Sequence, residues 1–344
     1  MSQHPTRRRV ERHASILFAL LVVFALFAGT ADAALSQWES APPMPAVRVH
    51  AGGVVAKQQL YVAGGCTGNG GGPTATFWRF DPTVNTWSAL APIPKPRCDP
   101  AAVSVPDGRI LVIGGFTGGL IHDLQRVWAY SPASNTWTAR ALVPGAPAGG
   151  QDAVTAGATI RRVYVIESGG PGFNGVIVPA HIYRYNQQTN IWSTLPATLP
   201  APRWEPALAA IGGDIYVFGG AMGTDGIGTP RATVWRYSIS TGQWKTLHPM
   251  PVAERGAIAV VGNDGMIYLV GGGDDPRIQV GDVRVQIYNP ATDTWTMGPS
   301  LTTPRAAPAA GRIGTAIYVA GGGDYPGMSE TLSSVDVATI SAGP

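Results

Sequence analysis

Leu60-Tyr-Val-Ala-Gly64-Gly65 opens a pattern that repeats along the chain, in which an apolar strand ends at a glycine pair and a tryptophan follows. The glycine pairs begin at Gly64, Gly114, Gly169, Gly219, Gly271 and Gly321. Tryptophans follow the first five pairs at Trp87, Trp137, Trp192, Trp244 and Trp295. Seven positions before each of these stands an aromatic residue: Phe80, Tyr130, Tyr185, Tyr237 and Tyr288. Three features that share a period of about 50 residues predict a propeller of β-sheet blades.

Each repeat divides into four strands. In the first repeat they are Val54-Val55 with its neighbours, Leu60 to Ala63, Phe77 to Phe80, and the segment that starts at Trp87. Apolar alternation with β-branched and aromatic residues, broken by Gly, Pro, Asn and Asp, is typical of strands and tight turns. The tryptophan and its aromatic partner should lie on adjacent antiparallel strands and pack between blades as core.

The sixth repeat ends without a tryptophan, and the missing strand is found near the other end of the chain. Gln37-Trp38 starts a segment that resembles those starting at Trp87 and Trp244. We expect this segment to complete the last sheet, which closes the ring and removes a free sheet edge. The predicted fold class is therefore all-β, a six-bladed propeller over residues 36–340 with no second domain.

Residues 1–33 are predicted to be a cleavable signal peptide. Arg7, Arg8, Arg9 and Arg12 precede an uncharged apolar run from Ile16 to Gly29, and Ala31-Asp-Ala33 follows as a cleavage site. A run of this length is short for a membrane span. An uncleaved membrane anchor is the alternative. We expect cleavage after Ala33 and a secreted or periplasmic protein with no other membrane span.

Charge argues against a nucleic-acid partner. The whole chain has a formal net charge of +3. Residues 1–33 carry four arginines against Glu11 and Asp32, so most of that excess belongs to the predicted signal and the remainder is near neutral. A nearly neutral domain lacks the basic surface that nucleic acid requires. A monomer without a cofactor is expected.

From Trp38 to Ile340 the repeats resemble the kelch-repeat β-propeller family. The third repeat departs most, because Gly150 replaces the usual arginine and Ile166-Glu-Ser-Gly-Gly interrupts the apolar strand. The resemblance implies a fold but no single activity, since such propellers include binding modules, structural proteins and enzymes. It also implies that ligands contact the face around the central channel, where the loops between second and third strands and between blades meet.

Residues at the start of each first strand should line that face. An arginine opens five of these strands: Arg48, Arg97, Arg203, Arg255 and Arg305. Two residues further on stand His50, Asp99, Asp152, Glu205, Ala257 and Ala307, and between the two sets stand Val49, Cys98, Gln151, Trp204, Gly256 and Ala306. This asymmetry predicts a shaped pocket. His50, Asp99, Asp152 and Glu205 are the candidate acid/base residues, because carboxylates that share a channel raise one another's pKa. The arginines are candidate ligand-binding residues, with structural pairing to acids as the alternative.

Loop residues on the same face complete the predicted ligand-binding set. They are Phe116, Phe173, Asp274 and Tyr325, together with Trp204. Aromatic rings can stack on sugars or apolar groups while carboxylates fix orientation. Ordinary turn chemistry is the alternative for the loop acids.

Several chemistries find no support in the sequence. The six histidines are scattered, and neither His-Glu-x-x-His nor Cys-x-x-Cys occurs. No metal site is predicted, although a carboxylate cation site from Asp99, Asp152 and Glu205 is a weak alternative. Galactose oxidase, a copper enzyme with similar blades, needs Tyr and His ligands and a Cys–Tyr cross-link. Only Cys66 and Tyr325 are nearby candidates here, so a copper oxidase is the least favoured function.

The two cysteines are expected to form one disulfide. Cys66 directly follows a glycine pair and Cys98 starts the next blade, so both should lie on the same face. Export makes oxidation permissible. Two free thiols are the alternative.

Two functional hypotheses follow. The first is a secreted binding module whose channel face recognises a glycan or a protein. The second is an enzyme that uses the carboxylates and His50 as general acid and base on a sugar, since exported bacterial kelch propellers include a sialic acid epimerase. For an anionic sugar, Arg97, Arg203 or Arg255 would have to face the channel as carboxylate clamps.

Overall fold

The computed structural model describes residues 1, 34–68, 71–117, 125–144, 151–156, 162–167, 170–171, 177–178, 180–222, 228–273, 281–324 and 330–341. For residues 151–153, 155, 170–171 and 177–178 it describes the backbone alone. The predicted signal peptide, apart from Met1, lies outside these ranges. Within them the chain forms β-strands without an α-helix, and no helix there is long and apolar enough to cross a membrane.

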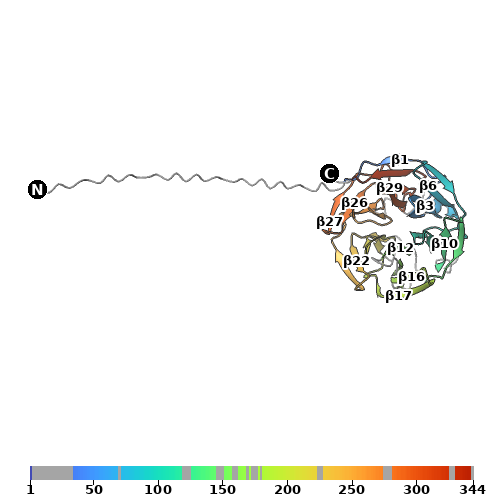
Figure 1. Cartoon of the computed structure of the whole chain (residues 1–344), viewed down its shortest axis with the longest axis horizontal. Coiled ribbons are helices and arrows are strands. Elements are labelled where there is room, and N and C mark those ends of the chain that lie inside the picture. Colours follow the sequence, from blue (N-terminus) through green and yellow to red (C-terminus); the bar gives the residue numbers. More distant parts are fainter. Residues whose placement is uncertain are drawn as a thin grey trace.

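The described strands include six four-stranded antiparallel sheets, which form the blades of a ring (Figure 1). Blade 1 holds β2 (Gly52–Ala56), β3 (Gln59–Ala63), β6 (Phe77–Asp81) and β7 (Thr86–Ala89); blade 2 holds β8 (Ala101–Ser104), β9 (Ile110–Ile113), β10 (Val127–Ser131) and β11 (Thr136–Ala139). Blade 3 holds β12 (Gln151–Ala156), β13 (Arg162–Glu167), β16 (His181–Asn186) and β17 (Ile191–Thr198); blade 4 holds β18 (Ala207–Ile211), β19 (Asp214–Phe218), β22 (Val234–Ser238) and β23 (Gln243–Leu247). Blade 5 holds β24 (Ile258–Val261), β25 (Ile267–Val270), β26 (Val285–Asn289) and β27 (Thr294–Met297); blade 6 holds β28 (Ala309–Ile313), β29 (Ala316–Ala320), β30 (Val335–Thr339) and β1 (Glu39–Ala41). The first strands of neighbouring blades contact one another around the axis, and the last strands form the rim.

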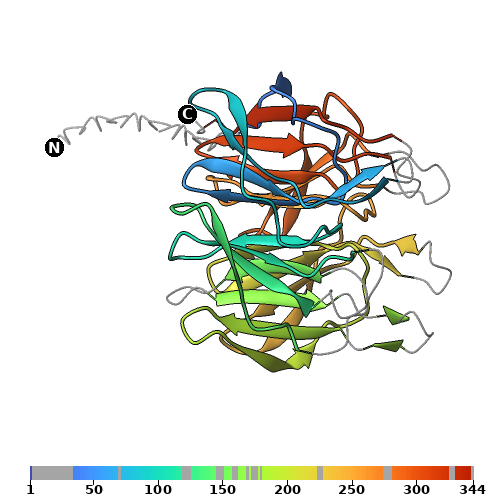
Figure 2. The same cartoon turned by 90° about the vertical axis from the view of Figure 1, so that its right-hand side faces the viewer.

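Among the described residues, three short hairpins extend the blades on one face of the ring. They are β4 (Cys66–Gly68) with β5 (Gly71–Pro73), β14 (Gly170–Pro171) with β15 (Ile177–Val178), and β20 (Ala221–Met222) with β21 (Thr229–Pro230). Figure 2 shows the ring from its edge, with these hairpins on the right-hand side. Each hairpin follows the second strand of its blade, so this is the face on which the sequence predicts ligand contacts.

The aromatic pairs that define the repeat lie on adjacent strands, as predicted. Phe80, Tyr130, Tyr185, Tyr237 and Tyr288 each stand directly opposite the tryptophan seven residues later. The ring centroids of the five pairs are 4.7–5.2 Å apart. Further contacts cross blade boundaries, such as Phe77 of blade 1 with Tyr130 of blade 2 at 4.7 Å. Buried aromatic pairs at this distance stabilise the interfaces between blades beyond their area burial.

A second set of contacts ties each blade to the one before it. The indole N–H groups of Trp38, Trp87, Trp137, Trp192 and Trp295 donate to backbone carbonyl oxygens of the preceding blade at 2.9–3.1 Å. The acceptor is always the fourth residue after the preceding tryptophan, for example Ala91 for Trp137. Trp244 is the exception among the described tryptophans that follow this repeat, because its buried indole N–H has no hydrogen-bond partner. The acceptor position for Trp244 is Pro196, which lies within the long strand β17.

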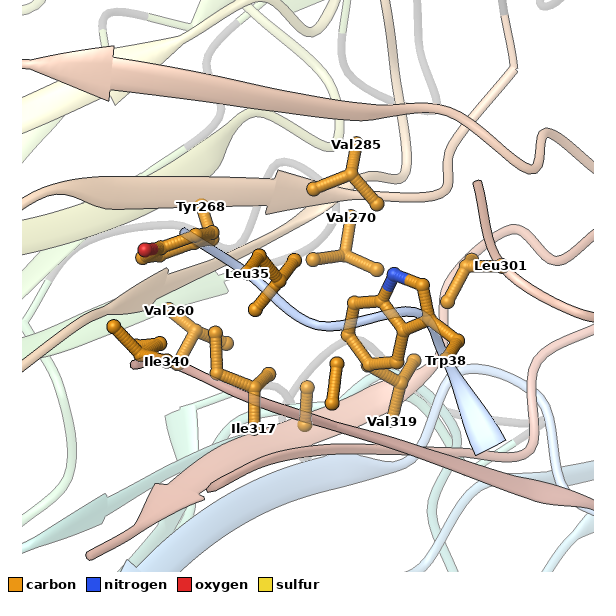
Figure 3. Packing of buried hydrophobic residues seen from close by; sticks show 12 residues of the cluster. Leu35, Trp38, Val260, Tyr268, Val270, Val285, Leu301, Ile317, Val319 and Ile340 are labelled. Atoms are coloured by element: carbon orange, nitrogen blue, oxygen red, sulfur yellow. The ribbon is translucent and has the colours of Figure 1, made fainter. Parts of the chain in front are cut away.

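The ring is closed by the N-terminal segment, as predicted. β1 pairs antiparallel with β30, and Leu35 forms a further bridge with Ile340. Trp38 is buried between blades 5 and 6, in the cluster shown in Figure 3, where its ring lies beside Leu301 and Val319. Closure leaves no unpaired inner or middle strand at the junction, which confirms the predicted all-β six-bladed architecture.

Candidate functional site

A cavity of about 300 Å³ lies on the axis of the ring, between the first strands of the blades. One group of lining residues is His50, Asp99, Glu205, Gly256 and Ala307, which we call the channel mouth. The rest of the lining is mostly small and apolar and includes Gly53, Ala102, Val154, Ala259 and Ala310. The volume lies at the lower end of the range for small-molecule sites, about 300–1,000 Å³.

The five channel-mouth residues occupy equivalent places and are joined by backbone hydrogen bonds. The N–H of Asp99 donates to the carbonyl of His50 at 2.7 Å, that of His50 to Ala307 at 3.1 Å, that of Ala307 to Gly256 at 2.8 Å, and that of Gly256 to Glu205 at 3.1 Å. All five have a left-handed backbone, with φ between 46° and 63°. This conformation costs residues other than glycine about 1–3 kcal/mol each, so the surrounding structure must impose it.

His50 and Asp99 face each other across the boundary between blades 1 and 2. The distance from His50 Nδ1 to Asp99 Oδ1 is 3.5 Å. The His50 side chain is 10% exposed and that of Asp99 is 37% exposed, so the carboxylate is the more accessible partner. Burial by itself lowers the pKa of His50, but the hydrogen bond and charge of Asp99, with the charge of Glu205, outweigh it and raise the pKa above the usual value.

Glu205 joins this pair from the far side of the mouth. Its negative charge acts on His50, and its Oε2 lies 3.6 Å from the place that a Cβ would occupy on Gly256. The absence of a side chain at Gly256 leaves this space beside the carboxylate open. The mouth therefore brings together one imidazole and two carboxylates, and these are the titratable side chains among the described residues that line the cavity.

Asp152 does not lie at the level of the channel mouth, although the sequence places it in the same set. It pairs with Ile166, and the equivalent pair in blade 1 is Gly52 with Ala63. Asp152 therefore corresponds to Gly52, two residues further along the first strand than His50. The miscount arises because the first hairpin of blade 3 is longer than that of blade 1.

The residue of blade 3 equivalent to His50 is Gly150, which lies outside the described residues. The predicted set of four polar residues on consecutive blades is thus wrong in its third member. The structure brings together His50, Asp99 and Glu205, and places the backbone of Asp152 deeper in the channel wall.

The opening arginines are buried within the blades, and their contacts there fit the structural alternative rather than ligand binding. The guanidinium groups of Arg48, Arg97 and Arg203 lie over the rings of Trp78, Trp128 and Trp235 at 4.4, 4.0 and 4.5 Å. Arg305 is 0% exposed and pairs with buried Asp336 at 3.2 Å. Burial lowers the pKa of Arg203 to about 10. The aromatic rings and carbonyl oxygens hold these cations inside the fold, which is a structural role.

Arg255 is not equivalent to the other arginines. The first hairpin of blade 5 is one residue longer than that of blade 1, since Ile258 pairs with Val270 whereas Gly52 pairs with Ala63. The arginine position is therefore taken by Glu254, which forms a β-bridge with the preceding blade there.

Both residues at this point of blade 5 are buried. Glu254 lies 3.6 Å from Arg284 Nε, and Arg255 stands at the place of Trp204 and Ala306 rather than of Arg48. The same shift places Gly256 at the mouth instead of the predicted Ala257, although both line the cavity. Blade 2 has a first hairpin of the same length, and there Arg97 keeps the arginine position because it stands 17 rather than 16 residues before its glycine pair.

Blade 3 carries a buried carboxylate at the end of its second strand. Its register places Glu167, rather than Gly169, where blade 1 has Gly64. The Glu167 carboxylate accepts a hydrogen bond from Tyr183 at 3.2 Å and lies 3.4 Å from His181 Nδ1. Burial raises the pKa of Glu167 above its ordinary value, although both partners oppose this shift.

Among the predicted loop residues, the structure describes Phe116 and Trp204. Phe116 is 44% exposed and pairs through its backbone with Cys98. Trp204 is partly buried and pairs in the same way with Ala221. Phe173, Asp274 and Tyr325 lie outside the described residues. Phe116 thus pairs with the residue before Asp99, and Trp204 precedes Glu205, but neither ring is among the described residues that line the cavity.

Cys66 and Cys98 form the predicted disulfide, with Cα atoms 5.1 Å apart. The bridge joins blade 1 to blade 2. No group of three or more metal-binding side chains occurs among the residues that the structure describes.

Comparison with known proteins supports the repeat assignment. Residues 48–94 and 97–141 match a family model described as the Kelch motif. Residues 169–323 match a second model, described as the KLHDC2/KLHL20/DRC7 Kelch-repeats domain.

Individual relatives match parts of longer proteins. Kelch-like protein terF of Aspergillus terreus is 37% identical over 148 residues, which are 40% of this chain and 32% of that protein. Kelch-like protein 35 of Mus musculus is 29% identical over 164 residues, which are 48% of this chain and 26% of that protein. The chain thus matches about a third or less of these relatives.

A solved structure titled "Structure of YjhT" shares the fold. Its TM-score is 0.68 at 16% sequence identity, and the match covers 86% of this chain and 95% of the other. At this identity the likeness concerns the fold alone.

Proposed function

Because the chain belongs to the kelch-repeat β-propeller family, we propose that it is a binding module whose channel mouth takes up part of a protein or glycan ligand. Kelch propellers commonly bind other proteins, which favours a protein ligand. The observation that carries the proposal is the cavity on the axis, with His50, Asp99 and Glu205 at its mouth and small apolar side chains along its walls.

The charges of the mouth favour a neutral or positively charged group of the ligand. Asp99 and Glu205 contribute carboxylates, and no lysine or arginine is found among the described residues that line the cavity. Of the three arginines that could have clamped an anion, Arg97 and Arg203 are instead packed on Trp128 and Trp235, and Arg255 is buried. Like charges repel at short range in a partly buried site, so an anionic sugar is disfavoured.

We place this binding outside the cytoplasm. The arginine-rich, apolar N-terminal segment supports export, and the Cys66–Cys98 disulfide is consistent with an oxidising compartment. Mass spectrometry of the protein recovered from its source would test cleavage after Ala33.

An array that carries both glycans and peptides would test the binding module. The wild-type protein should bind members with hydroxyl or ammonium groups, and Asp99→Asn with Glu205→Gln should weaken binding at least tenfold. A control double substitution of exposed residues outside the cavity lining, Val84→Ala with Met297→Ala, should leave binding unchanged. If the mouth variant binds like wild type, the ligand contacts another surface.

An acid/base enzyme is the second candidate, and the contact between His50 and Asp99 favours it. A histidine that is held beside a carboxylate can accept and donate protons near neutral pH. If an array hit is converted to a new product, the double variant should lose turnover by orders of magnitude rather than affinity alone. A hit that mass spectrometry recovers unchanged supports the binding module.

A further inference from the structure

His50 and Asp99 lie in different blades, yet their side chains are in contact. One backbone hydrogen bond joins the two residues directly, from the N–H of Asp99 to the carbonyl of His50. Both adopt the left-handed backbone, with φ of 52° and 55°. Two strained residues remain in register across a blade boundary only if their surroundings hold both in place.

The disulfide lies directly behind this pair. Cys98 is the residue before Asp99. Cys66 exchanges two backbone hydrogen bonds with Val49, of 2.8 and 3.1 Å, and Val49 is the residue before His50. A short closed path therefore runs from His50 through Val49 and Cys66 to Cys98 and Asp99.

This path is buried, and its backbone is hydrogen-bonded to neighbouring segments. Val49, Cys66 and Cys98 form one buried cluster, against which Ala307 of the mouth packs. Cys98 also exchanges two hydrogen bonds of 2.9 Å with Phe116, so its strand is fixed from the other side as well. The bridge thus constrains the backbone on which both side chains are mounted.

Other described blade boundaries carry no covalent link at this place. Ala221 and Arg255 occupy the equivalent positions between blades 4 and 5, and Gly273 and Ala306 occupy them between blades 5 and 6. The boundary that carries the imidazole–carboxylate contact is also the one that is cross-linked. The effect of a cross-link on the unfolded chain does not explain why the disulfide lies at this boundary, because a disulfide at any other boundary would also constrain the unfolded chain.

We propose that the Cys66–Cys98 disulfide is a positioning element of the channel mouth, which holds His50 against Asp99, so that breaking it separates the pair. The consequence for ligand recognition rests on the proposed function. The separation of His50 from Asp99 is measurable without any ligand. A result that contradicts this proposal can therefore be told apart from one that contradicts the proposed binding function.

The test replaces the bridge and measures His50 directly. In the purified Cys66→Ala/Cys98→Ala protein, the pKa of His50 is followed by NMR titration, with His50→Gln to assign the signal. We expect a pKa below that of the wild type and close to that in Asp99→Asn, because burial then acts without the carboxylate. The rate at which diethyl pyrocarbonate modifies His50 at pH 7 should rise in parallel, since this reagent attacks the neutral imidazole.

Two controls separate positioning from general stability. Val285→Ala removes buried volume in blade 5, far from the bridge, and should lower the melting temperature while leaving the His50 pKa unchanged. If the double alanine variant does not fold, Cys66→Val/Cys98→Ala fills the space, and reduction of the native wild-type protein supplies the same measurement. A folded protein without the disulfide that keeps the wild-type His50 pKa and modification rate overturns the proposal.

Discussion

The indole N–H of Trp38 donates a 3.0 Å hydrogen bond to the carbonyl of Pro299, 261 positions away along the chain. This bond joins the N-terminal strand of blade 6 to blade 5. Together with the pairing of β1 and β30, it makes the N-terminal segment the element that closes the ring. Closure of the ring therefore depends on contacts between an N-terminal segment and the last two blades.

Trp38→Ala should lower the free energy of unfolding by about 3–5 kcal/mol, because a buried indole is lost from the closing interface. Urea unfolding followed by tryptophan fluorescence would measure this. Val84→Ala, on an exposed turn, is the control and should change stability by less than about 0.5 kcal/mol. A small effect of Trp38→Ala would mean that the ring does not depend on this strand.

The tryptophans of blades 2 and 4 give a matched test of the hydrogen bonds between blades. Trp137 donates to Ala91 at 2.9 Å, whereas the buried indole N–H of Trp244 has no acceptor among the described residues. Phenylalanine removes similar volume from both sites but removes a hydrogen bond from one. Trp137→Phe should therefore cost about 1 kcal/mol more than Trp244→Phe in chemical unfolding. Equal losses would show that the bond contributes nothing to stability.

The ring and its aromatic pairs could be predicted from the sequence because their signals are local and repeated. Phe80 and Trp87 stand opposite each other across one tight turn, and a fixed turn length gives a fixed spacing in every blade. Closure by Trp38 was predictable for the same reason, since its segment resembles the other fourth strands.

The mouth was harder to predict because its residues lie before a hairpin of variable length. One extra residue in the hairpin of blade 5 moves Glu254 into the arginine position and Gly256 into the mouth. A longer hairpin in blade 3 moves Asp152 away from His50 in the same way. Counting along the chain cannot detect such shifts, whereas strand pairing fixes them. Structural pairing with acids was the stated alternative for the arginines and describes Arg305, whereas the tryptophan rings under Arg48, Arg97 and Arg203 were not foreseen.

Arg305 and Asp336 form an ion pair in which both side chains are almost fully buried, 3.2 Å apart. Removing either partner leaves an uncompensated charge, so Arg305→Met or Asp336→Leu alone should cost about 3–5 kcal/mol. The double variant should lose clearly less than the sum of the two single losses, which a double-mutant cycle in urea would measure. Additive losses would mean that the two side chains are energetically independent.

Glu167 should make blade 3 less stable at neutral pH than in acid. Its folded-state pKa is raised by burial, so the stability linked to its protonated form is present below the unfolded pKa and lost as pH rises through the folded pKa. Glu167→Gln keeps a polar group beside Tyr183 and removes the charge. This variant should be more stable than wild type at pH 7 and should show a flatter stability profile between pH 4 and 7. If Glu167→Gln destabilises the protein relative to wild type at pH 7 by as much as at pH 4, or by more, the assignment is contradicted.

His50 should contribute a pH dependence of its own, at higher pH. Its folded-state pKa is raised by Asp99 and Glu205 against the effect of burial, from an ordinary value of 6.5. The stability linked to the charged imidazole is therefore fully present below about pH 6.5 and lost as pH rises through the folded-state pKa. Asp99→Asn removes the main partner, so wild type should exceed this variant in unfolding free energy by more at pH 5.5 than at pH 8.5. Urea unfolding at both pH values would measure the difference, with Asp336→Asn as a control that removes a carboxylate remote from His50. An advantage of wild type over Asp99→Asn that does not change with pH would show that the imidazole of His50 is not held in its charged form by Asp99.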